Sequence, residues 1–126
     1  MTTTVDELAA SKYALMTTFR KDGTAVATPV WIVPYGDALA VWSYVGAGKV
    51  KRVRRRAAVT LATCDLRGNN VGESYPGRAR ILDAVATEEV RRQIRKKYGI
   101  SGRLTLWLSK VRRGDAGTVG IEITID

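Results

Sequence analysis

The sequence predicts a small, mainly β domain in which six antiparallel strands form a closed or partly closed barrel with short helices inserted. Short runs of β-branched, aromatic and apolar residues recur along the chain, and tight turns rich in Gly, Asp and Asn separate them. Three stretches with helical periodicity interrupt this pattern. With 126 residues and a mass of 13.8 kDa, the chain suits one domain over residues 1–126.

The N-terminal part predicts a short helix and a β-hairpin. A capping threonine followed by two acidic residues favours a helix over residues 4–11. Residues 13–20 and 25–33 have strand composition, and the Asp-Gly pair between them is typical of a hairpin turn. Pro29 cannot donate to a ladder, so we expect an edge, bulge or kink there that leaves backbone groups free for a ligand.

The other predicted strands are residues 38–44, 59–64, 75–82 and 118–125. In the third of these, Arg78 and Arg80 share one face, and an arginine inside a barrel would need an anionic partner. Three helical segments are predicted between the strands.

The first helical segment, residues 49–56, places Val50 and Val53 on one apolar stripe. The second opens at Thr87 and stops at Gly99. We expect its basic residues to face solvent: Arg91, Arg92, Arg95, Lys96 and Lys97. The third, residues 101–113, is expected to turn Leu104, Trp107 and Leu108 inward.

Composition excludes several classes of protein. The chain has no histidine and one cysteine, Cys64, which excludes His-based triads, His metal sites, CxxC redox pairs and intrachain disulfides. Cys64 is expected to be an inert thiol. The apolar runs are too short for a membrane span and the N-terminus is polar and acidic, so we expect a cytoplasmic protein.

The charge balance points to an anionic partner. Lys and Arg total 21 against 12 Asp and Glu, a net charge of +9, and the pI is near 10.1. Nucleic acid, an anionic membrane and a phosphorylated cofactor are all compatible with it. Only 7% of residues are aromatic, and no basic strand is interleaved with aromatics, which weighs against nucleic acid.

The densest basic segment is residues 46–56, where a glycine break precedes a helix start and six of the eight residues 49–56 are basic. Free amides, a helix dipole and ammonium groups together favour a phosphate. The segment lacks the P-loop pattern, so nucleoside triphosphates are not expected. A solvated helix face explains the same residues equally well. The hydroxyl of Ser43 just before it could donate to a phosphate or only to its own turn.

A second candidate is the kinked strand at residues 27–31, which could offer backbone donors and a flat wall to an aromatic ring system. Its alternative is ordinary core packing of Val30 and Trp31, the commoner case for such residues. Trp42 has the same two interpretations.

Several segments of the chain resemble those of a known family. Residues 13–24 (YALMTTFRKDGT), Thr28-Pro29-Val30-Trp31, Gly48-Lys49-Val50-Lys51-Arg52, residues 77–83 (GRARILD) and Lys97-Tyr98-Gly99 resemble, in this order and spacing, the actinobacterial split β-barrel proteins of the pyridoxamine 5'-phosphate oxidase-like class. Within that class they look like its small deazaflavin (coenzyme F420)-dependent branch. The similarity covers nearly the whole chain.

This resemblance implies a six-stranded, FMN-binding-like split barrel that forms a homodimer with the cofactor in a groove between subunits. It implies that the second strand lines the ring through Thr28, Pro29, Val30 and Trp31. It also implies that the phosphate is held by Ser43, Gly48, Lys49, Lys51 and Arg52. Trp31 or Trp42 would supply a stacking surface. Ala47 stands where family members often carry Ser or Thr, which removes one hydroxyl contact.

The function that follows from the resemblance is hydride transfer between reduced coenzyme F420 and a small unsaturated or carbonyl-containing molecule. Because a hydride carrier brings its own reactive carbon, the protein needs no nucleophile or dedicated base, and no catalytic side chain is predicted. Two alternatives share the fold: an FMN-binding oxidase-like protein and a non-catalytic F420 carrier. The surplus of basic residues suits the phosphate and oligoglutamate tail of F420 better than FMN.

Overall fold

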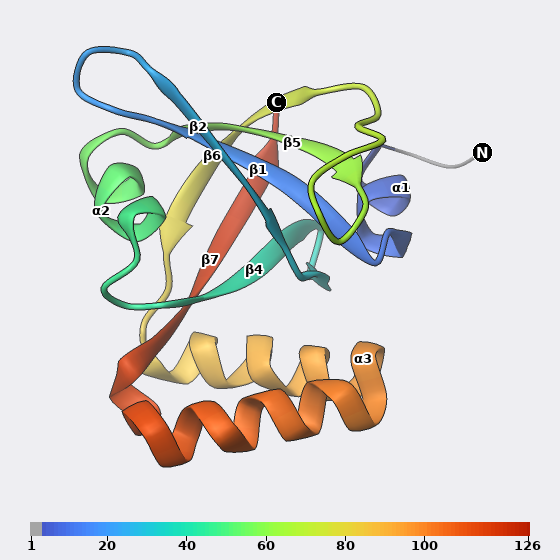
Figure 1. The fold of residues 1–126 in the computed structure, drawn as a ribbon, viewed down its shortest axis with the longest axis vertical. Helices are drawn as coiled ribbons and strands as arrows, with labels where there is room; N and C mark the ends of the chain where they lie inside the picture. The colour runs from blue at the N-terminus through green and yellow to red at the C-terminus, as the bar shows by residue number, and fades with distance from the viewer. Residues whose placement is uncertain (1–3) are drawn as a thin grey trace.

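A computed structural model describes residues 4–126, apart from the side chain of Asp115. Its centre is one seven-stranded antiparallel sheet, in the order β2-β1-β5-β6-β7-β4-β3, that curls into a half-barrel (Figure 1). The strands are β1 (Tyr13–Phe19), β2 (Ala25–Val30), β3 (Ile32–Tyr35), β4 (Ala38–Tyr44), β5 (Ala58–Cys64), β6 (Tyr75–Ile81) and β7 (Thr118–Ile125). The helices are α1 (Thr4–Ala10), α2 (Gly48–Arg55) and α3 (Ala84–Arg113), with a 3-10 turn, Asp115–Gly117, before β7. Within residues 4–126, no helix is both long enough and apolar enough to cross a membrane.

The mainly β class is confirmed, but the predicted number of six strands is wrong. The run at residues 25–33 is two strands, because the chain leaves one ladder at Trp31 and enters another. β2 pairs with β1, whereas β3 pairs with β4 at the opposite edge of the sheet. The two edges are thus joined through Trp31 without a ladder between them. Pro29 lies in an edge strand, as its missing donor predicted.

The core lies inside the curled sheet. Strand β1 alternates between buried and half-buried residues, as expected when one face packs inward. Met16, Leu61 and Ile121 are among its fully buried members. Leu8 of α1 and Val50 and Val53 of α2 pack against the same cluster, so the predicted valine stripe of the basic helix is confirmed.

Helix α3 is a helical hairpin that packs against the outer side of β3, β4 and β7 (Figure 1). It begins at Ala84 rather than at the predicted Thr87, because Asp83 is the N-cap and its Oδ1 accepts from the Ala86 amide at 2.8 Å. Thr87 is buried instead, and its Oγ1 accepts from the Gly120 amide at 3.0 Å. Gly99, with φ +57°, is where the chain folds back, as the predicted stop required.

The inward face predicted for the second half of α3 is wrong. Leu104, Trp107 and Leu108 are exposed, Trp107 by 60%, and Leu106 is buried in their place. The buried face contains Gly102, Leu106 and Ser109, at the i, i+4, i+7 spacing of one helix face. A Cβ on Gly102 would lie 2.8 Å from the Ile94 carbonyl oxygen, so glycine allows this close approach of the two halves.

Arg78 and Arg80 lie on the exposed side of β6, outside the barrel. Arg80 Nη2 is 2.8 Å from Glu122 Oε1 on the neighbouring strand β7. Because water reaches both arginines, neither needs the buried anionic partner that an interior position would have required.

Candidate functional site

The first turn of α2 forms a compact basic cluster, Gly48, Lys49 and Arg52, which we call the α2 cluster. Lys49 and Arg52 are half-buried, whereas Lys51 is exposed. Arg52 Nε donates to Thr18 Oγ1 at 2.6 Å, which anchors the guanidinium to strand β1. A Cβ on Gly48 would lie 2.6 Å from Arg52 Nη1, so a side chain here would push the guanidinium away from the helix start.

This cluster is electrostatically uncompensated. Burial, and secondarily the neighbouring Arg52, lower the pKa of Lys49. Among the described side chains, no ion pair joins an α2 residue to a carboxylate. The N-cap Ala47 offers no side-chain acceptor, and the amides of Gly48 and Lys49 donate to no described protein atom. Free helix amides beside half-buried cations are the donor set that proteins use for phosphate.

The predicted ring wall at Thr28, Pro29, Val30 and Trp31 does not present one face. Val30 is buried and Thr28 half-buried on one side of β2, while Pro29 is exposed on the other. Trp31 stacks on Tyr98 of α3, with ring centroids 4.4 Å apart and planes 12° apart. One face of the Trp31 indole is therefore already covered by this chain.

Lys97 and Tyr98 hold α3 against the strand crossover, a role that sequence reasoning missed. Lys97 Nζ donates to the carbonyls of Ala9, Ser11 and Ile32 at 2.7, 2.6 and 2.5 Å. Tyr98 Oη accepts from the Ile32 amide at 3.0 Å and donates to the Lys12 carbonyl at 2.7 Å. The solvent-facing position predicted for Lys97 is thus wrong, since three carbonyls take the place of water. In the sequence, the Lys-Tyr pair directly before Gly99 is the feature that could have pointed to this role.

Burial lowers the pKa of Lys97 to about 8 and raises the pKa of Tyr98 to about 12. The ordinary values are 10.5 and 10.0. Between pH 8 and 10.5 the unfolded chain therefore binds more protons at Lys97 than the folded chain, so stability rises with pH. Between pH 10 and 12 the folded chain retains the Tyr98 proton that the unfolded chain has lost, so stability falls.

We therefore expect the free energy of unfolding to rise from pH 8 towards pH 10 and to fall above it. Urea unfolding followed by circular dichroism at stepped pH measures this profile. Lys97→Met should flatten the rising limb, and Lys96→Met, at an exposed neighbouring position, should leave it unchanged. An identical rising limb in wild type and Lys97→Met would contradict the assignment.

Ser43 and Trp42, also predicted site residues, face different environments. The buried Ser43 Oγ donates to the Tyr44 carbonyl at 3.2 Å, its own turn. Trp42 lies on the opposite side of β4, in a cavity beneath α3. The structure thus brings Gly48, Lys49 and Arg52 together and separates Trp42 and Pro29 from them. Cys64 is half-buried, and burial together with Asp65 raises its pKa, which disfavours the reactive thiolate.

These features define a class: a curled antiparallel half-barrel with a basic helix start beside it. The family model for pyridoxamine 5'-phosphate oxidase matches residues 1–126. The chain belongs to this family, as the resemblance predicted. No curated protein matches the chain.

Solved structures with the same fold span several activities. A conserved hypothetical protein from Mycobacterium tuberculosis aligns with TM-score 0.70 and 17% identity over 96% of this chain and 77% of its own. A structure described as an F420 reductase aligns with TM-score 0.58 and 17% identity over 100% and 96%. The haem storage protein HutZ from Vibrio cholerae aligns with TM-score 0.67 and 10% identity over 97% and 78%. At these identities the likeness establishes the split-barrel fold alone.

Proposed function

We propose that this protein is a coenzyme F420-dependent oxidoreductase that transfers a hydride between the reduced deazaflavin and a small unsaturated or carbonyl-containing molecule. The observation that carries the proposal is the α2 cluster, in which half-buried Lys49 and Arg52 and two free amides have no carboxylate partner among the described residues. Family membership and the F420 reductase of the same fold support it.

The residues present fit the cofactor's phosphate. The amides of Gly48 and Lys49, the Lys49 ammonium and the Arg52 guanidinium would hold it, and the exposed Lys51 would face the glutamate tail. Thr28 and the outward backbone groups of β2 would lie along the ring, because an edge strand leaves half of its amides and carbonyls unpaired. When bound, the deazaflavin supplies the hydride chemistry, and the protein binds it, orients it and excludes water.

The residues of the proposed cofactor site do not line the cavity beneath α3. The cofactor would therefore lie on the surface of one protomer. A second copy of the chain would provide the opposite wall and exclude water from the ring. We expect a homodimer in solution. Light scattering coupled to size-exclusion chromatography should give a mass of about twice the 13.8 kDa of one chain. A monomer that binds cofactor at full affinity would contradict this arrangement.

Titration of the purified protein with coenzyme F420 and, in parallel, with FMN tests the function. Tryptophan quenching should show tighter binding of F420, weakening from low to moderate salt because the contacts are charged. Oxidation of reduced F420 in the presence of candidate enones and carbonyl compounds then tests hydride transfer. Binding of FMN alone would move the protein to the oxidase-like alternative, and binding of neither would end the proposal.

A non-catalytic F420 carrier is the second candidate. One observation that favours it is that HutZ, a haem storage protein, has the same fold. In addition, hydride transfer needs no catalytic side chain, so a carrier and an enzyme would have the same cofactor-binding residues. Carrier and enzyme differ in whether a second molecule fits above the ring. Tight F420 binding without oxidation of the reduced cofactor across the substrate panel would favour the carrier.

A further inference from the structure

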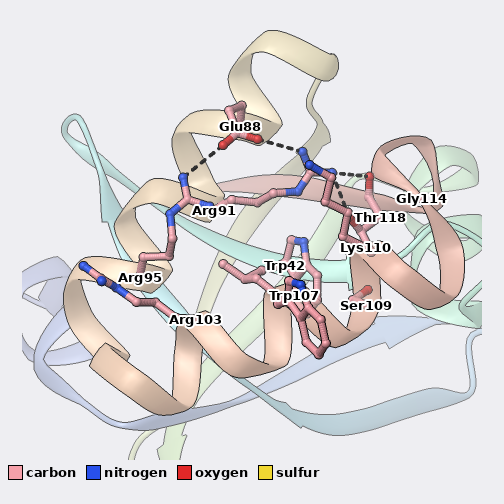
Figure 2. Close-up of a pocket in the computed structure, with 11 residues that line it drawn as sticks. Trp42, Glu88, Arg91, Arg95, Arg103, Trp107, Ser109, Lys110, Gly114 and Thr118 are labelled. Carbon is pink, nitrogen blue, oxygen red and sulfur yellow. Dashed lines mark hydrogen bonds and ion pairs between the residues drawn. The ribbon is translucent and has the colours of Figure 1, made fainter.

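A cavity of about 250 Å³ lies between the two halves of α3 and the strands β4 and β7 (Figure 2). No residue of the α2 cluster lines it. Trp42, Leu106 and Trp107 supply apolar walls. Ligand pockets for drug-sized compounds occupy roughly 300–1,000 Å³, so this one suits a smaller molecule, on the scale of a single ring.

Two residues that line this cavity each carry a buried polar atom that is closed to water and has no hydrogen-bond partner among the described residues: Trp42 Nε1 and Ser109 Oγ. Ser109 is 7% exposed. An indole N–H is a donor only, and a hydroxyl both donates and accepts. Leaving such groups unpaired away from water is unfavourable, so they mark a place where a hydrogen-bond acceptor would be stabilising.

The charge around the cavity selects for an anion. Among the side chains that the structure describes, its lining contains four cations, Arg91, Arg95, Arg103 and Lys110, and one carboxylate, Glu88. Glu88 is already engaged by Arg91 and Arg95, each at 3.0 Å (Figure 2). Arg103 and Lys110 have no carboxylate partner among the side chains that the structure describes. One further negative charge would therefore be favourable.

We propose that this cavity binds a small planar carboxylate, with its ring between the apolar walls and its carboxylate facing Lys110 and Arg103, where a small shift of the Trp42 and Ser109 side chains would let it accept from Trp42 Nε1 and Ser109 Oγ. A bare inorganic anion would leave the tryptophan and leucine walls without a partner, whereas a neutral ring would leave the cations uncompensated. The site is separate from the proposed cofactor site, because it shares no residue with the α2 cluster.

The test uses the full-length protein labelled with ¹⁵N and follows the indole N–H signals of its three tryptophans. Trp42→Phe assigns the Trp42 signal by its loss. Benzoate is the probe, and benzamide is the neutral control of the same shape. Benzoate should shift the Trp42 signal saturably, with an affinity at least about tenfold higher than benzamide, the ratio expected for a charge-assisted contact.

Variants locate the site. Ser109→Ala and Lys110→Gln should each weaken benzoate binding several-fold, and Lys96→Gln, an exposed residue of the same helix that does not line the cavity, should leave it unchanged. Benzoate should still bind Lys49→Ala, which separates this site from the proposed function. Circular dichroism melting confirms that each variant is folded.

Three results would overturn the proposal: no saturable shift of Trp42 with benzoate, equal affinity for benzoate and benzamide, or unchanged affinity in both Ser109→Ala and Lys110→Gln. The first, together with water cross-peaks to the Trp42 indole N–H, would show that ordered water alone satisfies these atoms.

Discussion

Replacing Ile121 with alanine is expected to lower the free energy of unfolding by about 2–5 kcal/mol, the usual range for an isoleucine truncated in a packed core. Ile121 is 0% exposed in the middle of β7. It pairs with Val41 of β4 and Ile81 of β6, so its side chain is held by strands on both sides. The neighbours belong to a continuous ladder and cannot collapse fully into the cavity that alanine leaves.

Urea unfolding monitored by circular dichroism measures this loss. The matched control is Ile100→Ala, because Ile100 is 86% exposed just after the bend in α3. Its replacement should change the free energy of unfolding by no more than about 0.5 kcal/mol. Comparable losses at the two positions would contradict the assignment of the core to the interior of the curled sheet.

Lys49→Ala is expected to weaken coenzyme F420 binding by roughly 1.5–3 kcal/mol, or about 10- to 150-fold, the scale of a hydrogen bond to a charged group. Lys49 is half-buried, its pKa is lowered by burial, and no described carboxylate pairs with it, so a bound phosphate would relieve an existing cost. The exposed Lys51 should matter less. Isothermal titration with F420 at two salt concentrations measures both variants.

Arg55→Ala is the control for the general field of this basic helix, since Arg55 is exposed in the last turn of α2. It removes the same charge without touching the α2 cluster. An equal loss in Lys49→Ala and Arg55→Ala would assign binding to the diffuse charge of the surface. Unchanged affinity in Lys49→Ala would return the cluster to a solvated helix face.

The local features of the fold were predictable because short-range chemistry sets them. The Asp-Gly turn requires a residue at positive φ, and Gly23 has φ +89°. Residues 34–37 form the next turn, and Gly36 within it also has a positive φ. Val50 and Val53 fix which side of α2 packs, so the basic residues must take the other side. Residue type and spacing alone were therefore enough to recognise the basic cluster.

Long-range pairing was not predictable in the same way. Residues 25–33 have the composition of a single strand throughout. They divide at Trp31 because β2 pairs with β1, whereas β3 pairs with β4. The second half of α3 has two apolar faces. The face that carries Leu106 is the buried one, because Gly102 on the same face permits close approach to Ile94. Neither choice has a local signal.

The sequence by itself determined the β class, the turns, the basic α2 segment and the family, since each depends on residue type and spacing along the chain. Only the tertiary structure decided which cations are half-buried, that Trp31 is covered by Tyr98, and that Trp42 and Ser109, each with an unpartnered buried polar atom, line one cavity beneath α3. The reason is physical: burial and hydrogen-bond satisfaction depend on residues far apart in the chain, so they are fixed only when the sheet curls and α3 folds back across it.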